Sequence, residues 1–276
     1  MEPLVSVIIP NFNNSRFILE AINSVILQDY ENIEIIVVDD GSTDNSLEVL
    51  SNLSSITLLS SINLGAASAR NIGILAAKGE YIALLDSDDV WERNKISLQL
   101  KFLLEHELDL VYCSGKVFGD SKEHGKILKA EYEGECYDYF KKYPSRAIVQ
   151  LGCSGAIFKK IMLSQVGLFD MRVPGPTEDW DFFRRFSRRG RIGFCSEVLV
   201  HYRRHENNTS EQSVQSYYLG NTVAILKMLH EDSDIGFLEK RLIWARFQFS
   251  AVKTFAKYHN YFQSLVALMR VFLPLP

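Results

Sequence analysis

The acidic segment Leu84–Asp89 is the first place where residue types and spacing could do chemistry. Within it, one residue, Ser87, separates Asp86 from Asp88 at the end of a short apolar run. Two carboxylates at this spacing can both point at one divalent cation, and Mg²⁺ or Mn²⁺ prefers oxygen ligands and often completes its shell with substrate phosphates. The alternative is a solvated acidic turn, with Asp89 capping the following helix. The position at a strand end favours the metal site.

A second acidic pair, Asp39 and Asp40, follows another apolar run and precedes Gly41. A carboxylate placed after a buried strand can accept hydrogen bonds from a base edge or a ribose hydroxyl, which makes Asp40 a candidate nucleotide ligand. Further along, Arg70 lies in an Ala-rich helical segment, where burial is costly without an anionic partner. A diphosphate or an acid such as Asp86 would satisfy this guanidinium. A surface arginine is the alternative.

Three carboxylates also lie close together at Glu178, Asp179 and Asp181. A carboxylate can take the proton from an attacking hydroxyl, and mutual repulsion among these acids could raise one pKa, which would suit a base. Trp180, between them, offers an apolar face on which a sugar can stack. The alternative is an acidic first turn of the helix predicted over Glu178–Arg189, which the helix dipole favours.

The elements that must position these side chains follow from hydrophobic periodicity. Four short apolar runs predict buried parallel strands: Val5–Ile9, Ile33–Val38, Ile56–Ser60 and Tyr81–Leu85. Three helical patterns lie between them: Ile18–Ile26, Asp44–Leu53 and Leu64–Lys78. Ser15 is the expected N-cap of the first helix. This order predicts an α/β fold with a mainly parallel sheet flanked by helices, in which ligands bind outside the carboxyl ends of the strands.

The middle of the chain alternates further predicted elements. Helices are expected over Lys95–His106 and Glu178–Arg189, and strands over Leu108–Phe118, Ala147–Phe158 and Ile192–Tyr202. The polar stretch Gly119–Tyr143 is expected to be loop and edge structure. From Gln215 onward the pattern is helical.

Six segments, read in this order, resemble the motifs of glycosyltransferase family 2. They are Pro10–Asn13, Val38–Ser42, Asn63–Asn71, Gly79–Asp89, Thr177–Asp181 and Tyr202–His205. The resemblance covers roughly residues 4 to 210. The family has Tyr more often than the Phe12 found here, a change that keeps the ring and loses a hydroxyl. The resemblance implies the Rossmann-like GT-A fold, inverting transfer from a nucleotide sugar, and Mg²⁺ or Mn²⁺ as cofactor.

The resemblance also implies roles for individual residues. Those implied to bind the nucleotide are Pro10, Phe12, Asp40, Arg70, Asp86 and Ser87. Asp88 is implied as the main metal ligand, assisted by Asp86 and His205, for which a solvent-exposed loop histidine is the alternative. Asp179 is implied as the catalytic base. Glu178 and Trp180 are expected to contact the acceptor.

Composition disfavours several other classes of protein. The chain has 276 residues, of which 47% are hydrophobic and 23% charged, as in ordinary globular proteins. Its net charge of -4 gives no support for nucleic-acid binding. None of its four cysteines forms a C-x-x-C pair, which favours reduced cytosolic thiols over a zinc site. We see no signal-peptide pattern and no apolar run of about 20 residues, so we expect a cytoplasmic protein.

Two domains are predicted: a GT-A catalytic domain over residues 1–212 and a helical C-terminal extension over residues 213–276. Within the extension, Leu242–Leu273 mixes aromatic residues and Leu with Lys and Arg and has almost no acids. Such a surface could rest on the anionic inner leaflet of a membrane. The alternative, which the helical spacing of the apolar residues favours, is a hairpin that packs on the catalytic domain or on a second subunit in a homo-oligomer.

The function predicted is an inverting hexosyl- or N-acetylhexosaminyl-transferase that uses a nucleoside-diphosphate sugar, with UDP favoured, to extend a glycan or lipid-linked acceptor in bacterial surface polysaccharide synthesis. A sugar-phosphate nucleotidyltransferase is the second enzyme class, but residues 10–14 are not the Gly-rich, basic phosphate loop expected of it. A nicotinamide-dependent oxidoreductase would show G-x-G-x-x-G after the first strand. A non-catalytic glycan-binding or scaffold protein could keep the fold, although the intact Asp88 and Asp179 argue against it.

Overall fold

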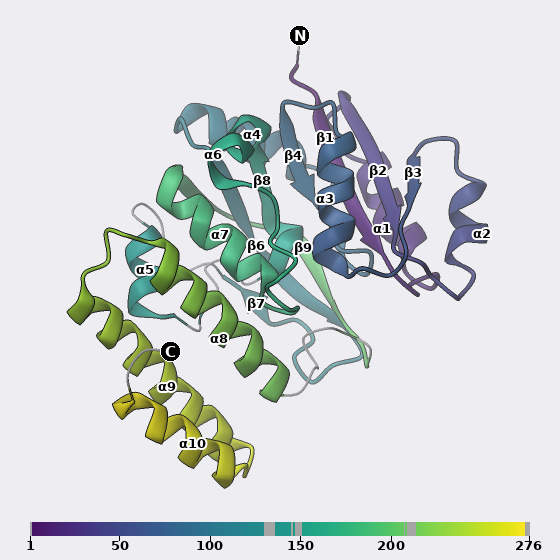
Figure 1. Cartoon of the computed structure of the whole chain (residues 1–276). Coiled ribbons are helices and arrows are strands. Elements are labelled where there is room, and N and C mark those ends of the chain that lie inside the picture. Colours follow the sequence, from purple (N-terminus) through teal and green to yellow (C-terminus); the bar gives the residue numbers. More distant parts are fainter. Residues whose placement is uncertain are drawn as a thin grey trace.

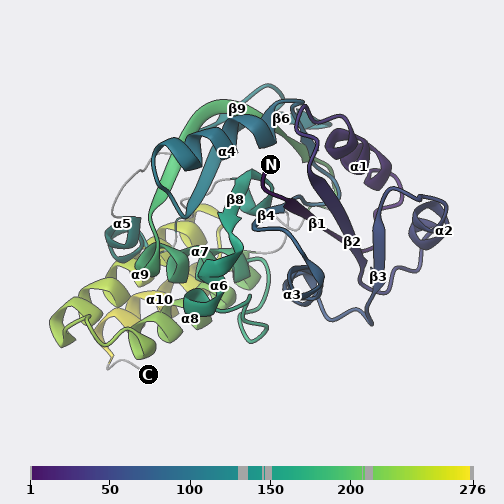
Figure 2. The same cartoon turned by 90° about the horizontal axis from the view of Figure 1, so that it is seen from above.

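The computed structural model describes residues 2–129, 136–144, 146, 151–206, 208 and 214–273. It is an α/β protein built on one curled sheet, with helices on both faces and further helices at the C-terminal end (Figure 1). The predicted fold class is confirmed. Seen from above, the curl of the sheet is plain, with α4 over one face and α7 and α3 on the other (Figure 2).

The first half of the sheet is parallel, as predicted. Its strands are β1 (Val5–Asn11), β2 (Ile33–Asp39), β3 (Thr57–Ser60) and β4 (Tyr81–Leu84). β1 pairs in parallel with both β2 and β4, and β2 pairs in parallel with β3. β1 is buried along its whole length, as expected of a strand covered on both faces. The carboxyl ends of β1, β2 and β4 therefore meet at one edge.

The helices α1 (Ile18–Ile26), α2 (Ser46–Ser51) and α3 (Ala66–Ala76) connect these strands. α3 lies unusually close to the sheet because Gly73 has no side chain. A Cβ at Gly73 would lie 2.4 Å from Cγ2 of Ile8 on β1. The small residues of this segment therefore do bring helix and sheet into close contact, which fixes the position of Arg70 on α3.

The second half of the sheet mixes directions. β8 (Ala156–Lys159) runs antiparallel to β4 and to β6 (Leu110–Gly119), and β9 (Ile192–Arg204) runs parallel to β6. β5 (Val90–Trp91) pairs with β9, and β7 (Ile127–Leu128) pairs with β6. Over the described ranges this makes a nine-stranded sheet of order β3-β2-β1-β4-β8-β6-β9-β5, with β7 beside β6.

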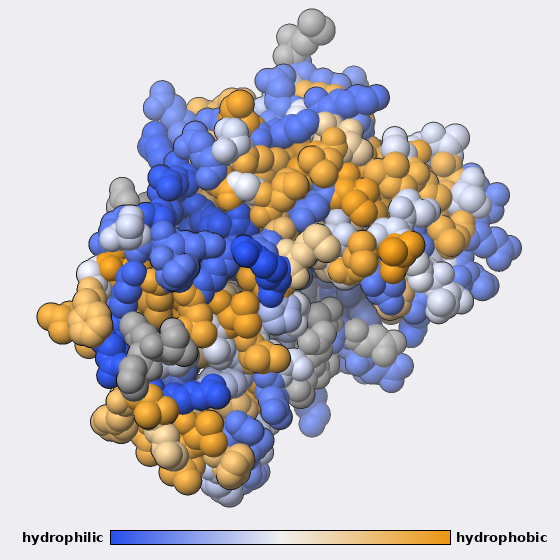
Figure 3. Space-filling view, viewed as in Figure 1, coloured by the Kyte–Doolittle hydropathy of each residue, from blue (hydrophilic) through white to orange (hydrophobic). Residues whose placement is uncertain are grey.

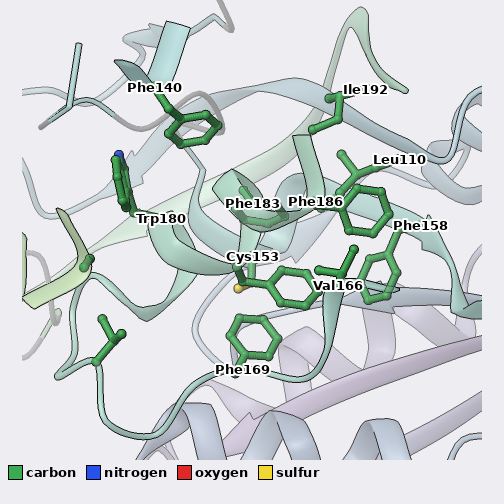
Figure 4. Close-up of a cluster of buried hydrophobic side chains, with 14 of the residues drawn as sticks. Leu110, Phe140, Cys153, Phe158, Val166, Phe169, Trp180, Phe183, Phe186 and Ile192 are labelled. Atoms are coloured by element: carbon green, nitrogen blue, oxygen red, sulfur yellow. The ribbon is translucent and has the colours of Figure 1, made fainter. Parts of the chain in front are cut away.

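Helices of the middle region cover the second half of the sheet. α4 (Lys95–Glu105) lies on one face, and α6 (Leu163–Val166) and α7 (Glu178–Arg189) lie on the other. Aromatic residues hold α7 on the sheet: Phe182 and Phe186 pack on Phe158 of β8 with ring centroids 5.5 and 5.6 Å apart. Figure 4 shows Phe186 beside Phe158. This packing fixes the N-terminal turn of α7, which carries Glu178 and Asp179.

Two local expectations in these regions were wrong. Ser15 does not cap α1: the residue before the helix is Phe17, and the backbone N–H of Ser15 instead donates to Asp44. The polar stretch after Gly119 contains β7 and also the helix α5 (Cys136–Lys142), because Tyr139 and Phe140 bury an apolar face there. Residues 130–135 lie outside the described part.

The expected strand over Ala147–Phe158 is much shorter than predicted. Residues 147–150 lie outside the described part, and Gly152–Gly155 forms a 3₁₀ turn rather than a strand. Strand β8 begins only at Ala156. Gly152 has φ +55°, in the left-handed region, which favours glycine and breaks the strand.

The C-terminal helices are α8 (Val214–Glu231), α9 (Phe237–Lys257) and α10 (Tyr261–Phe272), as the helical pattern predicted. α8 and α9 share one core cluster with the sheet, through residues such as Met228 and Phe247. Residues 209–213 lie outside the described part, and the domain division at residue 212 remains a prediction. None of the helices in the described ranges is long and apolar enough to cross a bilayer.

A buried charge network joins α7 to α8. Asp181, fully buried, accepts hydrogen bonds from Arg184 (3.0 Å), Arg185 (2.9 Å) and Lys227 (2.8 Å). Burial acts to raise the pKa of Asp181, but Arg185 and Arg184 outweigh it and hold the pKa below its usual value. Arg184 also donates to Asp232 at 2.8 Å. These buried ion pairs therefore stabilise the position of the first turn of α7.

Replacement of Asp181 by Asn is expected to destabilise the protein by about 3–5 kcal/mol, because it leaves buried cations without their shared carboxylate. Urea unfolding at neutral pH measures this. Asp234→Asn is the matched control, since the Asp234 side chain is 61% exposed, and its unfolding midpoint should stay close to that of the wild type. Equal midpoints for the two variants would show that the network contributes little.

Candidate functional site

The carboxyl ends of β1, β2 and β4 open into a cleft of about 1170 Å³. Its walls include every residue expected to bind the nucleotide: Pro10, Phe12, Asp40, Arg70, Asp86 and Ser87. They also include every residue expected at the metal, the base and the acceptor: Asp88, His205, Glu178, Asp179 and Trp180. The structure thus brings all the predicted site residues to one cleft.

At the end of the cleft nearest β2, Phe12 and Asp40 differ in solvent exposure. The Phe12 ring is 44% exposed and can be reached by a flat ligand. Asp40 is buried, and its two carboxylate oxygens accept the backbone N–H groups of Leu64 (2.9 Å) and Gly65 (2.7 Å). Asp40 therefore also ties the loop before α3 to the end of β2, a structural role that the sequence did not indicate.

Arg70 links the two acidic segments of the cleft. Its guanidinium is buried and donates to Asp86 at 2.8 Å and to Glu178 at 3.0 Å. The prediction that an acid such as Asp86 satisfies Arg70 is confirmed. The second carboxylate oxygen of Glu178 accepts no hydrogen bond from the described residues. Arg70 therefore holds α3, the end of β4 and α7 together at the centre of the site.

The Asp86 carboxyl experiences opposing effects. Burial raises its pKa, Arg70 lowers it, and the nearby Asp88 and Glu178 raise it again, with the net shift upward. Burial, Asp88 and Asp86 likewise hold the pKa of Asp89 well above its usual value. The acids at the end of β4 thus repel one another, and a cation placed among them would relieve that repulsion.

Asp88 lies at the outer end of this acidic loop. Its Oδ2 is 3.0 Å from Nε2 of His205 and accepts a hydrogen bond from Nδ2 of Asn208 at 3.1 Å. The His205 side chain is largely buried, 14% exposed, and packs on Phe17. The structure therefore places His205 beside Asp88 and excludes the alternative of a solvent-exposed loop histidine.

These residues fit a divalent ion that also binds phosphate. Neighbouring ligands of an octahedral ion, each about 2.1 Å from it, lie about 3 Å apart, as do Nε2 of His205 and Oδ2 of Asp88. In the described ranges no three His, Cys, Asp or Glu side chains are grouped to hold a metal alone. The remaining ligands would have to be substrate oxygens or water, which is the usual arrangement for Mg²⁺.

Arg203 of β9 holds the backbone of the acidic loop. Its Nε donates to the carbonyl oxygen of Asp88 at 2.7 Å, and its backbone N–H donates to Asp89 at 2.9 Å. The guanidinium lies 4.5 Å from the ring centroid of Phe17 and 4.2 Å from that of Phe118. Arg203 thus positions Asp88 without itself reaching the centre of the cleft.

The expectation that Asp89 caps a helix was wrong. Asp89 is buried and accepts hydrogen bonds from the Ser154 hydroxyl at 2.6 Å and from the backbone N–H of Arg203. The next helix, α4, begins only at Lys95. Asp89 therefore joins the loop after β4 to the 3₁₀ turn and to β9.

Asp179 lies in the first turn of α7, across the cleft from the acidic loop. Its Oδ1 accepts the backbone N–H of Trp180 at 2.6 Å. A Cβ at Gly152 would lie 3.6 Å from Oδ2 of Asp179 and 3.8 Å from Oδ2 of Asp86. The carboxylates of Asp86 and Asp179 therefore face the same small space. Burial, followed by the charge of Glu178, raises the pKa of Asp179 to about 7.

Trp180 does not present the open face that was expected. Its side chain is 4% exposed, lies edge-on to Phe140 with ring centroids 5.2 Å apart, and donates through Nε1 to the carbonyl oxygen of Arg146 (Figure 4). It therefore supports the cleft wall from within the core. Stacking of a sugar on this ring would require the wall to open.

Three further residues at the site were not predicted from the sequence. Asn14 donates to the Ser87 hydroxyl at 2.8 Å, Asn208 donates to Asp88, and Gly152 lies between Asp86 and Asp179. Asn14 immediately follows the first motif segment, so its position was a usable signal. Nothing in the residue types marks Asn208 or Gly152, because their contacts depend on the tertiary structure.

Residues 6–163 match the family model described as Glycosyl transferase family 2. An uncharacterized glycosyltransferase of Rickettsia prowazekii (strain Madrid E) is 35% identical over 246 residues, which are 86% of this chain and 72% of that protein. Family and relative agree with the predicted class of enzyme.

Two solved structures have a similar fold. S. aureus TarS 1–349 in complex with UDP-GlcNAc aligns with a TM-score of 0.72 at 21% identity, covering 99% of this chain and 82% of that TarS chain. The mannosyltransferase PcManGT from Pyrobaculum calidifontis, in complex with GDP-Man and Mn²⁺, aligns with a TM-score of 0.62 at 18% identity, covering 98% of this chain and 75% of PcManGT. At such identities the likeness shows the fold alone.

Proposed function

Because the chain belongs to glycosyl transferase family 2 and is a glycosyltransferase, we propose that it moves a sugar from a UDP-sugar to a hydroxyl of a glycan or lipid-linked acceptor, with inversion. The sugar is a hexose or N-acetylhexosamine, and the product belongs to a bacterial surface polysaccharide. TarS, whose fold is similar, has UDP-GlcNAc bound, which supports a uridine donor. The observation that carries the proposal is that Asp86 and Asp179 face one space beside Gly152.

In the proposed reaction the acceptor hydroxyl oxygen attacks the anomeric carbon, and Asp179 takes its proton. A carbon–oxygen bond forms to the acceptor while the bond to the diphosphate breaks, and the electron pair leaves on the diphosphate. Inversion requires a base on the face opposite the leaving group and no enzyme nucleophile. The raised pKa of Asp179, about 7, suits a base that works near neutral pH.

The donor would lie along the β1–β2–β4 edge. Its base would stack on Phe12 near Pro10 and Asp40, and its diphosphate would lie near Arg70 and Ser87; all five residues line the cleft. The base pocket is partly open, because the Phe12 ring is 44% exposed.

Asp88 and His205, whose Oδ2 and Nε2 atoms lie 3.0 Å apart, would supply two ligands of the divalent ion. Asp86, which accepts a hydrogen bond from Arg70 and is not grouped with them, would have to move to become the third. A bound Mg²⁺ or Mn²⁺ would neutralise charge that develops on the leaving diphosphate. PcManGT, whose fold is similar, has Mn²⁺ bound together with its donor.

The acceptor would enter between α7 and α8. Tyr217 and Asn221 of α8, Met171 and the segment Val173–Thr177 line this end of the cleft. The second carboxylate oxygen of Glu178 has no partner in the described residues but is buried, so an acceptor hydroxyl would reach it only if the cleft wall moved. A lipid-linked acceptor would require the enzyme to work at the cytoplasmic face of a membrane. The four buried thiols, which form no disulfide, are consistent with that reducing compartment.

The proposal is tested with a panel of UDP- and GDP-sugars, Mn²⁺, and Asp88→Asn. We expect the wild type to turn over a UDP-sugar, to lose activity on chelation, and to regain it with Mn²⁺. Asp88→Asn should weaken Mn²⁺ activation by at least about tenfold, the lower cost found even for residues that only orient metal ligands. Glu48→Gln, an exposed change on α2 away from the cleft, should behave as wild type. If the wild type neither binds nor turns over any donor, the chain is a non-catalytic protein with this fold.

A further inference from the structure

The outer surface of α10 is unusually apolar for a helix in water. Of its 12 residues, only Ala267 is buried. Large apolar side chains cover the rest of the helix, with exposed fractions from 37% to 75%: Tyr261, Phe262, Leu265, Leu268, Met269 and Phe272. Apolar residues visibly gather where α9 and α10 lie, at the lower left of Figure 3. A patch of this kind marks an interaction surface.

α9 continues this surface and shows that the helix has two different faces. Its inner face is buried against α8 and the core and consists of Ile243, Trp244, Phe247, Gln248, Ala251 and Phe255. Its outer face exposes Leu238, Leu242 and Phe249, which lie on one side of the helix at helical spacing. The inner face confirms that the hairpin packs on the catalytic domain. The outer face is apolar and remains exposed.

The same segment is strongly basic although the whole chain is acidic. Phe237–Leu273 contains six of the chain's 30 Lys and Arg but one of its 34 Asp and Glu. That acid, Glu239, is paired with Lys141 of α5. Within the described ranges no ion pair joins Arg246 or Lys253 to an acid, and both are exposed on α9. On α9, positive charge and exposed apolar side chains therefore occupy one face.

We propose that this face of α9 and α10 lies in the plane of an anionic lipid bilayer. The aromatic and aliphatic side chains would enter the boundary between headgroups and acyl chains, while Lys and Arg contact lipid phosphates. A second copy of the chain fits less well, because a two-fold symmetric interface would bring the same basic, acid-poor patch of both copies together. The hairpin lies on the surface and does not cross it.

The position of the hairpin gives this docking a use. On α8, Tyr217 and Asn221 line the cleft. Tyr218, which follows Tyr217, stacks on Phe247 of α9 with ring centroids 5.5 Å apart. Its hydroxyl is 2.8 Å from Nη1 of Arg270 on α10. The hairpin is thus one helix away from the end of the cleft where an acceptor would enter. Docking would hold that end close to the lipid surface.

The test is co-sedimentation of the full chain with vesicles of neutral phosphatidylcholine or of phosphatidylcholine mixed with phosphatidylglycerol. We expect binding to the anionic vesicles that falls at high salt, and little binding to neutral ones. Lys253→Glu with Lys257→Glu should lower the affinity more than about tenfold, since each charge near an anionic surface contributes about fivefold. Phe262→Ser, Leu265→Ser and Met269→Ser combined should abolish binding.

The matched control is Ile62→Ser with Leu75→Ser, which removes two exposed apolar side chains, 82% and 72% exposed, outside the hairpin. It should bind like the wild type. Equal binding by the triple variant and the wild type, or no binding by the wild type, would overturn the proposal. So would a dimer in analytical ultracentrifugation that the triple variant dissociates. Donor hydrolysis in solution should be unchanged in all variants, so failure here is distinct from failure of the proposed transfer activity.

Discussion

Asp179→Asn is expected to lower kcat about 10²–10⁴-fold, the range for loss of a positioned general base. The amide has nearly the same shape as the carboxylate but cannot take the proton of the acceptor hydroxyl. Donor and Mn²⁺ binding should stay close to wild type, since Asp179 lies across the space beside Gly152 from Asp86. Steady-state kinetics with donor titration by calorimetry measures both. An Asn variant that keeps more than a tenth of the activity would rule out Asp179 as the base.

The same residue is expected to control the acid side of the pH profile. Burial and Glu178 raise the pKa of Asp179 from 3.8 to about 7, so the base is ionised only above that pH. The rate should therefore fall about tenfold per pH unit below pH 7. In Asp179→Asn this limb should disappear and leave a flat, low rate. A wild-type profile that is flat down to pH 5 would contradict the assignment.

Stability provides a control for misfolding. Because the folded-state pKa of Asp179 lies above its unfolded value of 3.8, folding favours the protonated form. That contribution is present below pH 3.8 and is lost as the pH rises to about 7. At pH 8 the ionised carboxylate therefore costs stability, and Asn at this position should unfold at the same or a higher urea concentration than the wild type. A lost activity with raised stability would identify a functional group rather than a structural one.

Arg70→Met is expected to be the most damaging change at the centre of the cleft. It leaves Asp86 and Glu178 buried without their shared cation, which costs about 3–5 kcal/mol for a broken buried pair. Activity should fall as well, because the end of β4 and the first turn of α7 lose the group that joins them. Urea unfolding and kinetics, measured side by side, check both effects.

The pH dependence separates this electrostatic cost from simple loss of packing. Arg70 lowers the pKa of Asp86, so without Arg70 that pKa rises further, and the penalty is full where Asp86 would be ionised and shrinks as Asp86 is protonated at low pH. The difference between Arg70→Met and wild type should therefore be larger at pH 7 than at pH 4. Arg16→Met, an exposed arginine of the same cleft, should be close to neutral. A penalty independent of pH would mean that packing is the cause.

Much of the first half of the fold could be predicted because its signals are local. Buried parallel strands are continuous apolar runs, and β1, β2, β3 and β4 were found within two residues of their bounds. The strand-end acids followed from the same pattern, since a ligand site at the carboxyl edge of a parallel sheet depends only on strand order.

The remainder depends on contacts that no local pattern records. Trp180 was expected to face a sugar because it lies between acids, but its orientation is set by Phe140 on α5, a helix hidden in a polar stretch. Asp89 was expected to cap a helix, but its partners are on the 3₁₀ turn and on β9. In each case the deciding neighbour is far along the chain.

The C-terminal hairpin is another place where the sequence pattern predicts the helices but not which of their faces are covered. Apolar residues at helical spacing indicate that a helix has a face to cover, and α9 does cover one against the core. Sequence spacing cannot show that α10 has no comparable partner in the described ranges. That distinction needs the exposed fractions of residues such as Phe262 and Met269, which are 72% and 59%.

The backbone at Gly152 has one more consequence. Its φ of +55° and the distances of 3.6 and 3.8 Å from a hypothetical Cβ to the oxygens of Asp179 and Asp86 mean that main chain, not a side chain, borders the space between them. A side chain can rotate away, whereas a peptide in a left-handed turn has a fixed outline. In the proposed reaction this backbone would therefore limit the space between Asp86 and Asp179 that is left for the donor sugar.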